Sequence, residues 1–118
     1  TTVDLGAYEY QGGTTTDVDE DLPQVPDAFA LYQNSPNPFN PVTTIRFDLP
    51  RPEYVKLVVY NVKGELVATL ADQNMTAGSK EITWDAKDSG GRTATSGVYF
   101  YRLVAGDFVE TKKMILLR

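Results

Sequence analysis

Two pairs of neighbouring carboxylates are the best candidates for catalytic groups in this chain. They are Asp48 with Glu53, and Asp85 with Asp88. Two carboxyl groups can share the roles of general acid and general base, as they do in glycoside hydrolysis. Both pairs fall on expected outer faces or turns of β-strands, and nothing indicates a cleft around them. We therefore expect no catalytic residues and no enzymatic activity.

A calcium loop is the second chemistry that the sequence suggests, at Asp85, Asp88, Gly90 and Gly91. An EF-hand loop needs oxygen ligands at its first, third and fifth positions and a closing glutamate, and this order is absent. A plain β-turn explains the residues better. The chain has no cysteine and no histidine, which removes disulfides, thiolates and the commonest general base and zinc ligand. We expect no metal and no cofactor.

Charge is distributed unevenly along the 118 residues. The first 27 carry acidic side chains and no lysine or arginine, and all eleven basic residues lie from Arg46 onward. The net charge of −5 therefore comes from the N-terminal segment. The chain has no basic patch of the kind that replaces phosphate counterions, so we expect no nucleic-acid partner. No run approaches the ~20 apolar residues of a membrane helix, so we expect no membrane insertion.

Three zones follow one another along the sequence. Residues 1–13 contain one short alternating stretch and are interpreted as the remaining strand of an upstream domain. Residues 14–27 are acidic, contain two prolines and lack an amphipathic period, which is typical of a protease-sensitive linker. Residues 28–118 form the domain proper. Because the chain shows neither an initiator Met nor a signal peptide, we expect it to be a piece of a longer protein.

Seven β-strands are expected in residues 28–118, because alternating apolar and polar positions recur between Gly, Pro, Asn and Asp turns. Each strand has one apolar face that a second sheet must cover. We therefore predict an all-β fold, a seven-stranded antiparallel immunoglobulin-like β-sandwich. The expected strands are 29–33, 43–49, 54–62, 65–70, 79–84, 98–104 and 108–117. The expected core contains Ile45, Phe47, Leu57, Val59, Trp84, Tyr99, Tyr101 and Leu103, with Met114 and Leu116 also facing inward.

The aromatic residues Trp84, Tyr99, Phe100 and Tyr101 admit two interpretations. They could form a flat platform for a carbohydrate, or they could build the core of the sandwich. Their period-two spacing favours the core. The glycosylation sequon at residues 74–76 is interpreted as a chance match.

A set of motifs runs in order from residue 31 to residue 118. It comprises LYQNSPNPFNPVTTIRFDLP at 31–50, LVVYNVKGELV at 57–67, Trp84-Asp85, SGVYFYRL at 96–103 and KKMILLR at 112–118. Together these motifs resemble the C-terminal sorting domains of bacterial type IX (Por) secretion. They are also similar to the Ig-like module of the flagellar hook-capping protein. Ala86 and Thr95 depart from the pattern, at positions where glycine and proline or alanine are common.

The resemblance to sorting domains implies a role in export. Such a module folds in the periplasm, engages the outer-membrane secretion machinery and carries its upstream cargo domain to the cell surface or the medium. In this family it is often cut off or exchanged for an anchor near its N-terminal linker, here residues 14–27. The residues implied in recognition are Lys112, Lys113, Met114, Ile115, Leu116, Leu117 and Arg118. The motif residues are Pro36, Asn37, Pro38, Phe39, Asn40, Pro41, Gly97 and Tyr99.

Structural alternatives stay open at both motifs. The prolines at 36, 38 and 41 also suit an extended, polyproline-like crossover in which Phe39 closes the end of the sandwich. Residues 112–118 suit an edge strand whose charges block aggregation, although an exposed terminal strand can also be recognised by strand addition.

Two other functions compete with sorting. One is a structural Ig-like spacer or assembly module. The other is a carbohydrate-binding module beside a β-helix enzyme, because residues 3–10 are similar to the last strand of right-handed parallel β-helix proteins of the bacterial surface.

Overall fold

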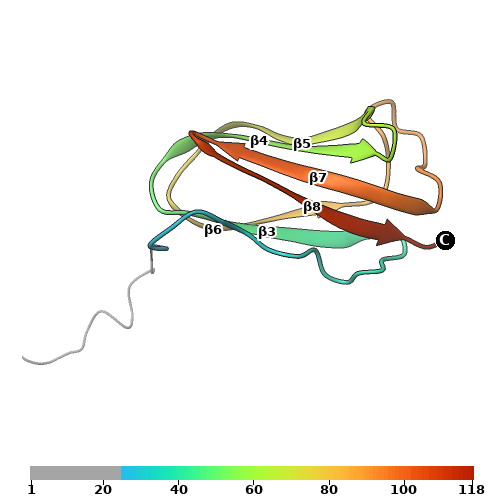
Figure 1. Cartoon of the computed structure of the whole chain (residues 1–118), viewed down its shortest axis with the longest axis horizontal. Helices are drawn as coiled ribbons and strands as arrows, with labels where there is room; N and C mark the ends of the chain where they lie inside the picture. Colours follow the sequence, from blue (N-terminus) through green and yellow to red (C-terminus); the bar gives the residue numbers. More distant parts are fainter. Residues whose placement is uncertain (1–24) are drawn as a thin grey trace, which may run out of the picture.

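The computed structural model describes residues 25–118, and these form two β-sheets packed face to face (Figure 1). The expected strand at 1–13 and most of the expected linker at 14–27 lie outside the described residues. One sheet contains, in spatial order, β2 (Ala30–Leu31), β3 (Thr43–Leu49) and β6 (Gly78–Trp84). The other contains β5 (Leu66–Met75), β4 (Glu53–Asn61), β7 (Gly97–Ala105) and β8 (Phe108–Leu116). All neighbouring strands are antiparallel, which confirms the predicted sandwich.

Two strands differ from their predicted lengths by more than two residues. β2 has two residues instead of five, because beyond Leu31 the contact with β3 continues only as the amide bond of Tyr32 to Arg46 and an isolated bridge of Ser35 to Thr44. β5 continues to Met75 instead of ending at Leu70, since it stays paired with β4 as far as Glu53. The extra part of β5, ADQNM, lacks apolar alternation, so the pairing partner and not the local pattern sets its length.

The core lies between the sheets, and all eight residues predicted for it are buried. Met114 and Leu116 are buried as well, as predicted. The ring of Trp84, from the three-stranded sheet, lies 5.7 Å from the ring of Tyr99 and 5.8 Å from that of Phe39, measured between centroids. Because Trp84, Tyr99 and Tyr101 are buried, these residues form the core and not a platform for carbohydrate.

The hairpin between β7 and β8 is tight. Ala105 pairs with Phe108, which leaves Gly106 and Asp107 in the turn. Gly106 has a φ of 59°, a left-handed value that a glycine at the first central position of a two-residue hairpin adopts without strain. Within residues 25–118, no helix is long and apolar enough to cross a membrane.

Candidate recognition site at the C-terminal strand

β8 carries most of the residues that the sequence implied in recognition, and it lies at the edge of the four-stranded sheet. Its side chains alternate between two environments. Met114 and Leu116 point into the core and are fully buried. Lys113 and Ile115 occupy the opposite side of the strand, and Leu117 just beyond it is 53% exposed. The seven residues therefore do not form one continuous surface.

The three basic residues of the terminus lie in three different environments. Lys112 is on the inward side of β8, its side chain is 28% exposed, and its Nζ lies 3.3 Å from a carboxylate oxygen of Glu110. Lys113 is exposed on the outer side. The Nε of Arg118 donates to the carbonyl oxygen of Ala94 at 2.8 Å, which ties the end of the chain to the loop before β7. Lys113 and Arg118 are exposed, whereas Lys112 is half-buried.

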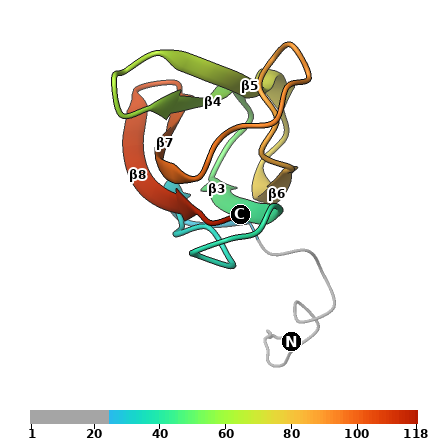
Figure 2. The same cartoon turned by 90° about the vertical axis from the view of Figure 1, so that its right-hand side faces the viewer.

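The motif at 36–41 lies against the outer edge of the last part of β8. Phe39 forms a parallel bridge with Leu116. Its amide donates to the carbonyl oxygen of Ile115, and its own carbonyl oxygen accepts from the amide of Leu117, each at 2.9 Å. Figure 2, which views the sandwich from this end, shows the segment beside the C-terminus. Phe39 is buried, so its predicted role in closing the end of the sandwich is confirmed.

Two side chains extend this contact along β8. The Nε2 of Gln33 donates to the carbonyl oxygen of Lys113 at 2.7 Å, and the Oδ1 of Asn37 accepts from the amide of Ile115 at 3.0 Å. Together with Phe39, they occupy the outward-facing backbone groups between Lys113 and Leu117. The sequence suggested that this end of the terminal strand could be recognised by strand addition. The structure differs, because the edge is already paired within the domain.

The motif segment is bent and not polyproline-like, and a buried polar cluster holds it. It runs between a bridge of Ser35 to Thr44 and the bridge of Phe39. The side chain of Asn34 donates to the hydroxyl of Thr43 at 2.9 Å and to the carbonyl oxygen of Pro36 at 3.1 Å. Sequence reasoning missed Asn34 and Thr43, because single polar residues in a turn-rich stretch do not reveal that they are buried.

The hydroxyl of Tyr101 connects this cluster to β7. It accepts a hydrogen bond from the amide of Asn34 at 2.8 Å and donates one to the carbonyl oxygen of Tyr32 at 2.7 Å. Burial raises the pKa of Tyr101 to about 12, because the phenolate would lose its hydration. Tyr101 therefore acts as a neutral donor and acceptor that fastens the crossing segment to the four-stranded sheet.

The carboxylates that could have supported chemistry are engaged separately. Asp48 accepts hydrogen bonds from Tyr32 and Ser79, whereas Glu53 pairs with Arg51. Asp88 accepts from the amides of Arg92 and Gly90 within a turn, and these bonds lower its pKa below the ordinary value, that from Arg92 most. This geometry fits the β-turn interpretation. In the described part of the chain, no group of three His, Cys, Asp or Glu residues is placed to hold a metal.

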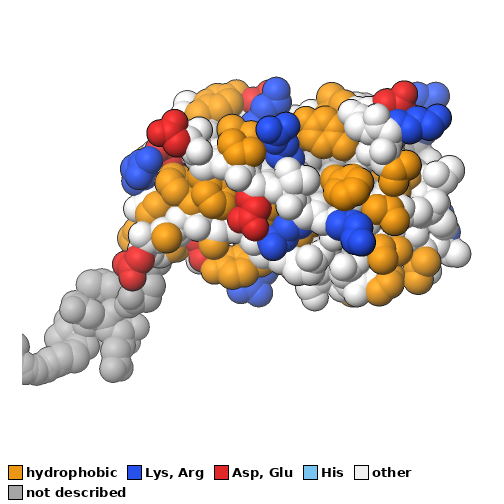
Figure 3. All heavy atoms as spheres, viewed as in Figure 1, with side chains coloured by type: hydrophobic (Ala, Val, Ile, Leu, Met, Phe, Trp, Pro, Cys, Tyr) orange, Lys and Arg blue, Asp and Glu red, His pale blue; other side chains and the backbone are white. Residues whose placement is uncertain are grey.

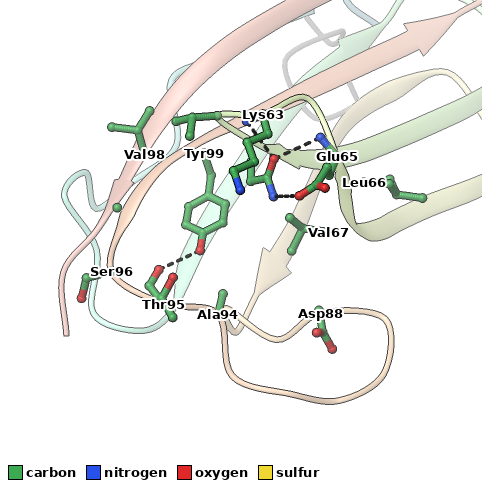
Figure 4. A pocket seen from close by; sticks show the side chains of 13 residues that line it. Lys63, Glu65, Leu66, Val67, Asp88, Ala94, Thr95, Ser96, Val98 and Tyr99 are labelled. Carbon is green, nitrogen blue, oxygen red and sulfur yellow. Dashed lines mark hydrogen bonds between the residues drawn. The ribbon is translucent and has the colours of Figure 1, made fainter.

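An open groove of about 660 Å³ lies at the end of the sandwich that holds the β4–β5 turn, and residues 94–99 line its other side (Figure 4). Its polar groups bond to one another: the hydroxyl of Tyr99 donates to the carbonyl oxygen of Thr95, and Asn61 bonds to Glu65. The motif residue Gly97 borders it with a φ of 150°, a value that other residues rarely adopt. Gly97 and Tyr99 therefore have structural roles here.

The model of the FlgD Ig-like domain family matches residues 37–107. The chain belongs to this family. The matched span runs from the 36–41 motif to the β7–β8 turn, so it includes most of the core of this Ig-like domain. No curated protein matches the chain.

Three solved structures have the same fold as this Ig-like domain. FlgD from P. aeruginosa is 27% identical with a TM-score of 0.51, over 63% of this chain and 58% of that one. Latent PorU from Porphyromonas gingivalis is 24% identical with a TM-score of 0.62, over 74% of this chain. PorZ from the same organism is 19% identical with a TM-score of 0.51, over 78% of this chain. The match spans only 9% of PorU and 12% of PorZ.

Proposed function

We propose that this Ig-like domain is a sorting module that directs a longer bacterial protein through the periplasm and across the outer membrane, to the cell surface or the medium. The observation that supports this most is the direct contact between two sequence motifs. Residues 36–41 and 112–118 lie far apart in sequence, and each resembles a signature of sorting domains. They are hydrogen-bonded to each other at one end of the domain.

The likeness to Por proteins supports the same proposal. PorZ is an essential bacterial surface component of the type IX secretion system. The proposal requires no catalysis, because a folded module is selected by its surface and the cargo is carried in the same chain. Its partners are then the outer-membrane secretion machinery and the upstream cargo domain.

A reporter fusion tests the proposal. Residues 1–118 are placed after a signal peptide and a reporter, and the fusion is expressed in a bacterium with type IX secretion. We expect reporter on the surface or in the medium, and reporter in the periplasm when the same fusion is made in a strain without the secretion system. Export that does not depend on the secretion system, or a folded fusion that stays in the periplasm, would refute sorting.

A structural spacer or assembly module is the second candidate. The family match and the 27% identity to FlgD favour it, because these are likenesses to a protein outside the Por group. On this proposal the fused domain stays in the periplasm and instead associates with copies of itself or with a neighbouring domain. Light scattering of the purified chain at rising concentration measures self-association directly.

A further inference from the structure

The terminal strand offers the solvent only part of its surface, and this restricts how it can be recognised. The inward side chains of Met114 and Leu116 are buried in the core. The backbone edge from Lys113 to Leu117 is occupied by Phe39 and the side chains that accompany it. What a partner can contact on this part of the folded domain is therefore the outer side of β8 and of the strands beside it.

The outer side of β4, β7 and β8 forms one surface, which we call the outer sheet face. The register places Tyr60 beside Phe100 and Phe100 beside Lys113, which makes one row across the three strands. A second row places Arg102 between Val58 and Thr111. A third places Val98 beside Ile115. Cross-strand neighbours on one face are in contact distance, so aromatic, aliphatic and basic groups are continuous here.

A shallow depression of about 310 Å³ lies in this face, lined by Tyr60, Phe100, Arg102 and Thr111 together with the β4–β5 turn. The aromatic residues are half-buried although no strand of the described chain packs over them. Figure 3 shows hydrophobic side chains interspersed with lysine and arginine in the region where β7 and β8 lie in Figure 1, and an acidic side chain is also visible there.

The outer face of the other sheet shows the opposite character. Its positions on β3 and β6 are mostly polar and bonded to one another: Arg46 lies 3.6 Å from Glu81, and Asp48 accepts from Ser79. That is the usual pattern for a sheet with one solvated face. The outer sheet face does not show this polar pattern. Exposed apolar patches rimmed by polar groups often mark interaction sites.

The charges of the outer sheet face have one sign. Its positions on β4, β7 and β8 include Lys56, Arg102 and Lys113 and no carboxylate. Asp72 faces Lys56 from the more distant strand β5. In residues 25–118, neither Arg102 nor Lys113 lies in an ion pair. A partner with acidic groups around an apolar centre would complement both the charge and the hydrophobicity of this surface.

We propose that the outer sheet face is the docking surface for the secretion machinery, and that its receptor presents carboxylates to Arg102 and Lys113 around an apolar patch. This inference rests on the proposed sorting function and names the surface that carries it. Arg102 supplies a planar fork for a carboxylate, and Lys113 a point charge. Phe100 and Ile115 supply the apolar centre.

The test uses the signal peptide–reporter fusion of residues 1–118 and reverses two charges at a time. The variant Arg102→Glu with Lys113→Glu alters the outer sheet face. The matched control, Arg46→Glu with Lys87→Glu, makes the same change in net charge on exposed residues elsewhere. Urea unfolding of both purified variants verifies that they are folded. We expect at least about a tenfold loss of exported reporter in the first variant, which is ~1.4 kcal/mol of binding free energy, and less than about twofold loss in the control.

The outcomes separate the two proposals. Export of the first variant within about twofold of the unmodified fusion overturns the docking surface and leaves sorting intact. Equal losses in both variants show an effect of net charge and also overturn it. Failure of the unmodified fusion to be exported refutes sorting itself. If the purified chain is a dimer that Arg102→Glu with Lys113→Glu dissociates, the face binds a second copy and not a receptor.

Discussion

Tyr101 shows how much one side chain contributes to this domain. Its ring lies in the core, on β7. Its hydroxyl accepts a hydrogen bond from the amide of Asn34 and donates one to the carbonyl oxygen of Tyr32. These two bonds connect the sheets across the segment that later covers the end of β8. A buried hydroxyl that makes both of these hydrogen bonds stabilises the fold. Without the hydroxyl, the buried amide and carbonyl groups would be left unpaired, which lowers stability.

Replacing Tyr101 by Phe should lower the free energy of unfolding by about 1–3 kcal/mol, because the amide of Asn34 loses its acceptor in a buried place. Urea denaturation measures the loss. Tyr60→Phe is the control, since Tyr60 lies on the outer sheet face. A Tyr101→Phe domain as stable as the unmodified one would show that water replaces the hydroxyl.

Alkaline pH should weaken the domain through the same residue. The pKa of Tyr101 is about 12 in the folded state, above its ordinary value of 10.0. The folded state therefore holds this proton more tightly than the unfolded state. Its contribution to stability is complete below about pH 10 and is lost as the pH rises through about 12. We expect the free energy of unfolding to fall less steeply over this range in Tyr101→Phe, and equal slopes would contradict the assignment.

Trp84 is the second residue whose loss should be severe. Its ring is 2% exposed between Phe39 and Tyr99, and its Nε1 donates to the carbonyl oxygen of Lys87. Trp84→Ala should cost about 3–5 kcal/mol, since the cavity cannot close between two sheets. Chemical denaturation followed by circular dichroism measures this, because the variant lacks its only Trp. A cost below about 1 kcal/mol is incompatible with the packing described here.

At the scale of elements, β8 is held on both sides. β7 pairs with it along its whole length, and the 36–41 segment pairs with its last residues. In the described chain, no strand pairs with the outer backbone edge of β8 before Lys113. Edge strands expose unpaired backbone groups and are often blocked by charges or by covering loops. In β8 the covering segment protects the C-terminal part.

Removing the side chain of Phe39 should loosen that cover. Phe39→Ala should lower stability by about 3–5 kcal/mol, the range for a buried Phe. In addition, the amide of Leu117, which donates to Phe39, should exchange with solvent faster relative to amides of β4. Hydrogen exchange measures the global loss of stability and the local exchange rate of the Leu117 amide. The control is Asn40→Ala, because Asn40 is an exposed neighbour. Uniform acceleration at all strands would mean that Phe39 acts only through the core.

The β7–β8 turn depends on one glycine. Gly106 has a φ of 59°, and a Cβ on it would lie 2.9 Å from the carboxylate of Glu53. Gly106→Ala should therefore destabilise the domain by about 1–2 kcal/mol through left-handed backbone strain. Gly90→Ala is the matched control, since Gly90 has no positive φ and its nearest contact is at 3.4 Å. Thermal unfolding should separate the two variants by several degrees, and equal midpoints would contradict this account.

At the scale of the whole molecule, the two sheets share one core, and each sheet needs the other to bury its apolar face. Trp84 belongs to the smaller sheet, yet one of its ring contacts, Tyr99, belongs to the larger. Single domains of this size usually unfold cooperatively. We therefore expect the domain to unfold as a single unit.

Cooperative unfolding can be measured with two probes. Fluorescence of Trp84 reports on the junction of the sheets, and far-ultraviolet circular dichroism reports on all strands. Their urea transitions should coincide, with one midpoint and one slope. Separate midpoints would show that the three-stranded sheet detaches first, and the single-core description would then be wrong.

Alternation of apolar and polar residues predicted most of the strands and which of their side chains face inward. Ile45, Phe47, Leu57 and Val59 were assigned correctly because alternation along a strand and burial of one face have the same period. The turn at Gly106 was equally local, since it depends on residues that adjoin in the chain. The unusual composition of residues 36–41 marked a special segment, and its resemblance to a family suggested why.

The contact between the two motifs could not be predicted from the sequence and is visible only in the folded domain. The bonds of Phe39 to Ile115 and Leu117 join residues more than seventy positions apart, and no local pattern says where a bent, proline-containing segment leads. The same holds for Asn34, whose amide is bonded by Tyr101 from a strand far along the chain. The division has a physical cause. Periodicity records which side of a strand avoids water, whereas the pairing of an edge depends on which distant segment reaches it in the folded chain.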